Sequence, residues 1–148
     1  MHWRSKMRNV TLFFLFGVLF FAGCAGVVGP KQPQECSERL YGVKWQVVMI
    51  NNDPVSLAKA PYIRFAKDGK IGGFGGCNSF FGEVSVTETA IDFIKIGATR
   101  RFCAGVGGET ERRLFSILKG VKWWQFDEDD NLVIFDDEVR LILKKSAG

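Results

Sequence analysis

The chain has 148 residues, a hydrophobic fraction of 47% and a formal net charge of +4 at pH 7. Three of its 20 Lys and Arg residues, but none of its 16 acidic residues, lie in the first 23 positions, so the remainder carries 17 basic against 16 acidic residues. This balance excludes a strongly cationic surface, and we expect no nucleic acid partner. The single histidine is His2. The rest of the chain therefore lacks Ser-His and Cys-His pairs and the commonest zinc-ligand sets.

The N-terminal segment is typical of an export signal. A hydrophobic run over residues 10–22 follows three basic residues. Its 13 residues are too few to span a bilayer core, which needs about 20, but they fit the apolar region of a secretory signal. Cys24 comes directly after an Ala-Gly pair, which predicts a bacterial lipoprotein signal peptide over residues 1–23. Phe21 stands where Leu is usual, and cleavage of a plain secretory signal is the alternative.

Cys24 is the predicted lipidation site and the predicted first residue of the mature chain. A diacylglyceryl thioether and an amide-linked acyl chain such as palmitate would hold the protein to a membrane, where one chain alone is marginal. Ala25 follows the cysteine where an Asp would retain the protein at the inner membrane. We expect a location in the cell envelope, at the outer membrane facing the periplasm if the host has one.

The first half of the remaining chain predicts a tether and then a series of short strands. Residues 24–39 are rich in Gly, Pro, Gln and charge, which favours a flexible tether, and the folded domain is expected over residues 40–146. An Asp-Gly pair at 68–69 predicts a tight hairpin turn. Short apolar runs bounded by turn residues predict strands at 44–50, 62–66, 71–74, 83–87 and 91–96.

The apolar period then changes to that of a helix. Glu111, Leu114, Phe115 and Leu118 fall on one helical stripe and predict a helix over residues 109–119, with Gly120 at its end. Three further runs predict strands at 121–126, 132–135 and 139–143. The expected fold class is α+β, with a mainly antiparallel curved sheet or open barrel of about eight short strands and one late helix.

Cysteine spacing points to a disulfide. Cys77 lies in a glycine-rich segment over residues 72–82 that permits a close approach of the backbone, and Cys103 follows 26 residues later. An exported domain favours a bridge between the two, which the chain-entropy estimate puts at about 3.5 kcal/mol. Two buried thiols are the alternative, because spacing does not establish the geometry of a bridge. Cys36, in the predicted tether, would be left over, as a reactive thiol or paired between molecules.

The order of these features resembles the META domain, also called HslJ-like. The family pattern has a strand with Trp, a Pro and Phe before a Gly turn, Gly-Cys-Asn with a later Gly, Thr before Cys, and a helix that starts with Glu. The matching residues here are Trp45, Pro61, Phe65, Gly69, Gly76-Cys77-Asn78, Gly82, Thr99, Cys103, Glu111, Phe115 and Leu118. The resemblance implies an envelope protein linked to stress or antibiotic tolerance, with an open, cracked barrel like that of secretion pilotins. It implies no catalytic residues.

Aromatic residues offer a binding hypothesis. Phe80, Trp124 and Phe126 are the candidate residues of an apolar groove, which Trp123 and Phe81 could also line. The groove would take a hydrophobic small molecule or a helix of an envelope protein partner, with ordinary core packing as the alternative. We expect a binding protein rather than an enzyme, without a cofactor or a metal. A thiol-redox role for Cys77 and Cys103 and a purely structural envelope domain are the alternative functions.

Two polar segments are candidate sites. Four residues match positions of a calcium loop, but Leu132 stands where that loop requires Gly, which favours a solvated hairpin turn; the four are Asp127, Asp129, Asn131 and Glu138. Arg100 and Arg101 could hold an anion or a lipid head group, with a solvated loop as the alternative.

Overall fold

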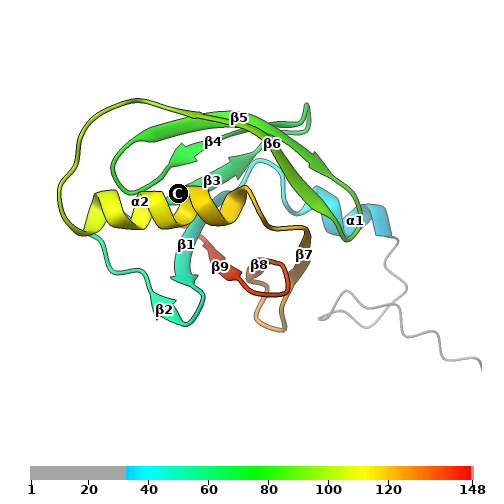
Figure 1. Cartoon of the computed structure of the whole chain (residues 1–148). Helices are drawn as coiled ribbons and strands as arrows, with labels where there is room; N and C mark the ends of the chain where they lie inside the picture. The colour runs from blue at the N-terminus through cyan, green and yellow to red at the C-terminus, as the bar shows by residue number, and fades with distance from the viewer. Residues whose placement is uncertain (1–32, 148) are drawn as a thin grey trace, which may run out of the picture.

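A curled antiparallel sheet and the helix that crosses its open side form the centre of the structure (Figure 1). The structure, a computed structural model, describes residues 33–147. The described elements are α1 (Pro33–Glu38), β1 (Lys44–Ile50), β2 (Asp53–Pro54), β3 (Tyr62–Phe65), β4 (Lys70–Phe74), β5 (Ser79–Val86), β6 (Ile91–Ala98), α2 (Val106–Leu118), β7 (Trp123–Phe126), β8 (Leu132–Phe135) and β9 (Arg140–Lys145). This architecture confirms the predicted fold class.

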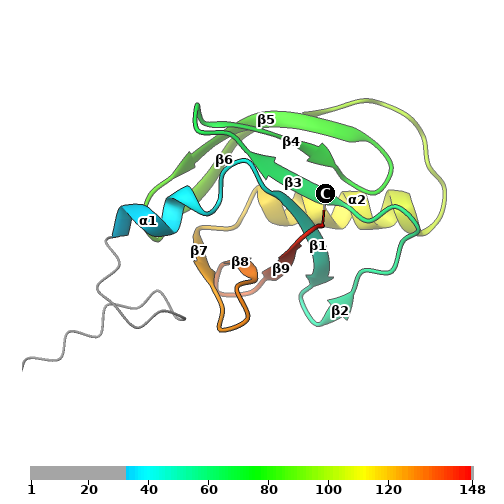
Figure 2. The ribbon, with the colours of Figure 1, turned by 180° about the vertical axis from the view of Figure 1, so that it is seen from behind.

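Each strand of the main path pairs antiparallel with its neighbours. The order is β6-β5-β4-β3-β1-β9-β8-β7, with the two-residue β2 paired to β1. The chain therefore runs outward from β1 to one edge, crosses the open side through α2, and returns from the other edge to β1 (Figure 2). Within residues 33–147 no helix has the length and apolar character needed to cross a membrane.

The two edges of the sheet meet at one end, which makes a seam. Ala90, just before β6, forms an antiparallel bridge with Trp123 of β7. The Ile91 N–H donates to the Lys122 carbonyl at 2.9 Å, and the Trp124 N–H donates to the Thr89 carbonyl at 3.0 Å. Beyond this seam the two edge strands are not neighbours in the sheet, and α2 lies across the gap (Figure 1). The barrel is therefore closed at one point and open along the rest.

Alternation along β1 shows how the sequence fills the core. Trp45 and Val47 point inward and are fully buried, and the indole N–H of Trp45 donates to the Leu40 carbonyl at 2.9 Å. Pairing with β9 shifts between Val47 and Met49, so Ile50 also faces the core. Buried side chains of the sheet and of α2 form one hydrophobic cluster.

One helix lies where the sequence predicted a tether. Pro33–Glu38 forms α1, and Cys36 is buried there with 7% of its surface exposed. Leu40, four residues later, is fully buried. The two buried side chains thus have the spacing of a helical face, which is hard to recognise in a segment of mostly polar residues. Cys36 is not free, contrary to the leftover thiol that was expected. The predicted signal peptide and Cys24 lie outside the described residues.

Acidic side chains organise the two hairpin turns that follow β7 and β8. The Asp127 carboxylate accepts the N–H groups of Asp129 and Asn131 at 3.0 and 2.9 Å, and the Asn131 side-chain amide at 2.9 Å. Partial burial alone would raise the pKa of Asp127, but these hydrogen bonds and the charge of Lys144 together lower it below the ordinary value. The geometry is that of a capped turn, as the sequence favoured over a calcium loop.

Acid should weaken this turn. Because the folded-state pKa of Asp127 is lowered, its contribution to stability is present above the unfolded value, near 3.9, and is lost as pH falls through the folded value. We expect Asp127→Asn to lower the free energy of unfolding by roughly 1 kcal/mol at pH 7 and to have no effect near pH 2. Urea denaturation at both pH values measures this. Asp129→Asn is the control, because its carboxylate accepts no hydrogen bond among the described residues, and an equal loss in the control would contradict the prediction.

Candidate functional site

The glycine-rich segment makes a tight turn between β4 and β5. The Gly75 N–H donates to the Asn78 carbonyl at 2.8 Å, and Gly76 has a φ of 122°, which favours glycine. A Cβ on Gly76 would lie 2.8 Å from the Gly107 carbonyl oxygen, and one on Gly75 would lie 2.8 Å from the Glu111 side chain. The turn therefore rests directly on the first turns of α2, which confirms that these glycines serve a close approach.

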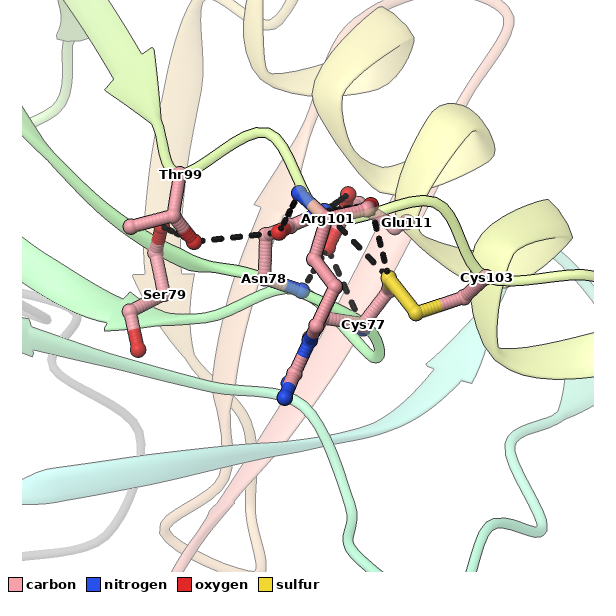
Figure 3. The surroundings of a disulfide bond; sticks show 7 residues. All are labelled: Cys77, Asn78, Ser79, Thr99, Arg101, Cys103 and Glu111. Atoms are coloured by element: carbon pink, nitrogen blue, oxygen red, sulfur yellow. Dashed lines mark hydrogen bonds between the residues drawn. A yellow bond between two sulfur atoms is a disulfide. The ribbon is translucent and has the colours of Figure 1, made fainter.

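Glu111 joins α2 to this turn. Its side chain is buried, and its Oε2 accepts the N–H groups of Cys77 and Asn78 at 3.1 and 2.5 Å (Figure 3). Its Oε1 accepts the side-chain amide of Asn78 at 2.8 Å. Three N–H donors thus converge on one carboxylate, and among the described residues Glu111 forms no ion pair. Charge-assisted hydrogen bonds of this kind are stronger than neutral ones.

Asn78 connects the turn to the segment that follows β6. Its Oδ1 accepts the Thr99 hydroxyl at 3.0 Å and the Arg101 N–H at 2.8 Å, while its Nδ2 also donates to the Arg101 carbonyl at 3.0 Å (Figure 3). An amide has both the donors and the acceptor that this position needs, whereas a carboxylate could not donate. No buried side-chain N or O atom among the described residues lacks a hydrogen-bond partner.

A disulfide between Cys77 and Cys103 closes the same cluster (Figure 3). The Cα atoms are 5.9 Å apart, a usual separation for a bridge, and Cys77 is 3% exposed. The Arg101 guanidinium donates to the Cys77 carbonyl at 3.0 Å. The predicted pairing is confirmed, and the alternative of two thiols is wrong for this structure. We name the turn, Glu111, Thr99, Arg101 and the disulfide the signature cluster.

The chemistry of the signature cluster is that of a clamp. Its carboxylate, amide and carbonyl groups bond to one another and hold three chain segments together. Within residues 33–147 no three His, Cys, Asp or Glu side chains come together in a way that could hold a metal ion. Arg100 is exposed in the adjoining loop, where Phe102 is 91% exposed.

The three aromatic residues of the predicted groove do not lie together. Trp124 and Phe126 are 3% and 6% exposed and touch edge to face, with ring centroids 5.6 Å apart. Phe80 is 3% exposed and packs against Phe115 of α2 at 5.4 Å. Much of each ring therefore belongs to the core, which was the alternative interpretation.

A shallow groove nevertheless runs along β7, and we name it the β7 groove. Its volume is about 270 Å³, and its lining includes Cys36, Thr89, Trp123, Trp124, Phe126 and Phe135. Trp123 is 37% exposed, and its ring lies 6.1 Å from that of Phe135 on β8. The sequence offered Trp123 as a lining residue but not Phe135. Successive side chains of a strand point to opposite faces of the sheet, so Trp123 and Trp124 lie on different faces of β7.

Comparisons with known proteins identify the family. The sequence pattern of the META domain matches residues 38–148, and the chain therefore belongs to the META domain family. No curated protein matches the chain.

Solved structures show the same fold. An NMR structure of a protein from Burkholderia xenovorans is 17% identical, with a TM-score of 0.61, and the match covers 88% of this chain and 99% of that one. A second NMR structure is 24% identical with a TM-score of 0.58, over 78% of this chain and 95% of that one. At these identities the likeness concerns the fold alone.

Glu111 should be essential for stability. Glu111→Ala leaves buried N–H groups of the turn without an acceptor, and we expect the free energy of unfolding to fall by about 3 kcal/mol. Glu109→Ala removes an exposed carboxylate from the same helix and should lower it by less than about 1 kcal/mol. Chemical denaturation measures both. An equal loss of unfolding free energy in the two variants would contradict the role of Glu111 in holding the turn to α2.

The disulfide should stabilise the fold through its loop. With a sequence separation of 26 between the cysteines, replacing both Cys77 and Cys103 by Ala should lower the free energy of unfolding by about 3.5 kcal/mol. The oxidised wild type and the double variant would be compared in urea without reductant. Equal stability of the two would contradict the prediction. Reduction of the native bridge by mild thiol would instead favour a redox role.

Proposed function

We propose that this protein is a lipid-anchored component of the bacterial envelope whose META domain acts by binding. The support comes from the export signal, the Ala-Gly-Cys24 sequence and a disulfide, which persists in oxidising compartments. Diacylglyceryl and acyl groups on Cys24 hold it to the membrane. In a host with two membranes it faces the periplasm from the outer membrane.

The β7 groove is the binding site in this proposal, and the observation that carries it is the partly exposed Trp123 beside the seam. Trp123 and Phe135 form the outer wall, and the largely buried Trp124 also lines the groove. Trp123 lies at the seam itself and keeps 37% of its surface exposed, so aromatic surface is accessible at this edge. Such a surface suits an apolar, ring-containing small molecule.

The position of the β7 groove next to α1 also supports a binding role. Cys36 of α1 lines the groove, and the Arg39 guanidinium stacks over Phe126 at 4.0 Å, so the end of α1 forms part of the site. The chain leads from α1 toward the predicted anchor. A hydrophobic compound partitioned into the membrane would thus meet the groove near the surface it leaves. Capture of such compounds would link the protein to tolerance of stress or antibiotics.

The anchor is tested on the full chain produced in a bacterium. We expect a mature N-terminus at Cys24 carrying diacylglyceryl and acyl mass, with the protein in the membrane fraction, and we expect Cys24→Ala to abolish both. Intact-mass spectrometry of the purified protein measures this. Cleavage at another residue, or a Cys24 sulfur joined to another cysteine rather than to lipid, would overturn the anchor.

The groove is tested with N-phenyl-1-naphthylamine, a neutral probe that fluoresces in apolar sites. The mature chain carrying Cys24→Ser should bind it, and Trp123→Ser should raise the Kd about tenfold because it removes the outer wall. Phe81→Ser, which removes a 65% exposed ring from the outer face of β5, is the control and should leave the Kd unchanged. Equal binding by both variants would overturn the proposed site.

A further inference from the structure

A second groove lies beside the β3–β4 hairpin, and its size suits a small ligand. Its volume is about 490 Å³, within the range of roughly 300–1,000 Å³ typical of ligand sites. Its lining includes Tyr41, Arg64, Phe65, Lys67, Lys70 and Gly72. We name it the Tyr41 groove. None of these residues lines the β7 groove, so the two are separate sites.

The groove is hollow where Gly72 has no side chain. The register places Arg64, Gly72 and Phe81 in one row across β3, β4 and β5. Arg64 is exposed and Phe81 is 65% exposed, so this row faces outward, and Gly72 leaves bare backbone beside Arg64. The row thus offers a charged end and a bare stretch of backbone, while the Phe81 ring lies against Gly97 and does not line the groove.

The chain after α1 builds the opposite wall. Tyr41 forms a parallel bridge with Phe65, and the Gly42 N–H donates to the Phe65 carbonyl at 3.1 Å. These backbone contacts fix the tyrosine beside the hairpin. The groove therefore exists before any ligand enters, and binding would not have to order its walls.

The charge of the lining selects the ligand. Arg64, Lys67 and Lys70 line the groove, and no carboxylate does. Lys67 pairs with Glu38 at 2.5 Å outside the lining, and the Asp68 carboxylate accepts the Lys70 backbone N–H at 3.1 Å.

Among the described residues, neither Arg64 nor Lys70 forms an ion pair. The Arg64 guanidinium lies over the Tyr62 ring at 5.8 Å. Lys70 lies opposite Glu83 in the register, while Glu83 itself pairs with Lys95 at 3.8 Å. The lining of the β7 groove, by contrast, includes Glu88, and the nearby Arg39 pairs with Asp130.

We propose that the Tyr41 groove binds an anionic amphiphile, a molecule with one carboxylate or phosphate group and an apolar chain. The anionic group lies between Arg64 and Lys70, and the chain runs over Gly72 against Tyr41. A free fatty acid and a phospholipid head group with the start of its acyl chain share this chemistry. The proposal is independent of the anchor and of the β7 groove.

The first experiment uses decanoate as the probe and follows backbone amide shifts by NMR in the mature chain carrying Cys24→Ser. Decanoate should shift the amides of Tyr41, Arg64 and Gly72. Acetate, which lacks the chain, and decyl maltoside, which lacks the charge, should bind at least about tenfold more weakly. Decanoate shifts confined to residues outside the groove, or equal binding of all three compounds, would overturn the proposal.

Variants identify the contacts. Gly72→Val fills the hollow, and it should fold because a Cβ there meets only the Phe80 carbonyl at an ordinary 3.7 Å. It should abolish binding, and Arg64→Gln should raise the Kd about tenfold. Lys119→Gln, an exposed cation at the end of α2, is the control and should leave the Kd unchanged. An unchanged Kd in Gly72→Val would overturn the site.

Vesicles distinguish the source of the ligand. Sedimentation with phosphatidylglycerol but not phosphatidylcholine vesicles, lost in Gly72→Val, would support the groove and identify a lipid head group. Binding of decanoate without sedimentation would support it and identify a free amphiphile. Binding of neither would overturn it. Because Trp123→Ser leaves the Tyr41 groove intact, it should retain decanoate binding even if the β7 groove fails its own test.

Discussion

The convergence of three N–H groups on the Glu111 carboxylate is the constraint on which the rest of the structure depends. A buried carboxylate is expensive unless its oxygens are bonded, and the turn between β4 and β5 supplies those bonds. Glycine at 75 and 76 lets the turn approach closely enough. The Asn78 side chain in turn accepts hydrogen bonds from Thr99 and Arg101, which fixes the segment after β6. One acidic residue on α2 therefore positions the helix, the turn and the loop before it, and the disulfide reinforces an arrangement that the hydrogen bonds already define.

The curl of the sheet depends on paired use of glycine and phenylalanine. Phe80 faces inward, where a Cβ on Gly73 would lie 2.7 Å from its ring, and Phe81 faces outward, where a Cβ on Gly97 would lie 3.0 Å from its ring. Aromatic rings thus cover bare backbone on both faces of β5. At Gly82 a Cβ would lie 1.9 Å from the Lys95 carbonyl oxygen, next to a shift in register. Strong local bending brings the edges close enough for a seam.

Sequence patterns predicted much of the fold because most strands alternate cleanly between core and solvent. The bounds of β1 and β8 agree with the prediction, and the helix and the Cys77–Cys103 pairing were also correct. The two-residue β2 and the short α1 carry too few apolar residues for a period to be visible. The site was predicted less well. Aromatic identity alone could not separate Phe80, which faces the helix, from Trp123, which faces the groove, because that difference depends on where the sheet closes.

The seam is made largely by main-chain atoms, since carbonyl groups of Thr89 and Lys122 meet backbone N–H groups of the opposite edge. Such bonds do not specify side chains. Mutations at residues 88, 89, 122 and 123 can therefore alter the rim of the β7 groove without opening the barrel. Substitutions by glycine or proline are the exception, because these residues weaken strand pairing. The fold thus separates the residues that hold the architecture, gathered around Glu111, from a rim whose side chains can change while the architecture is kept.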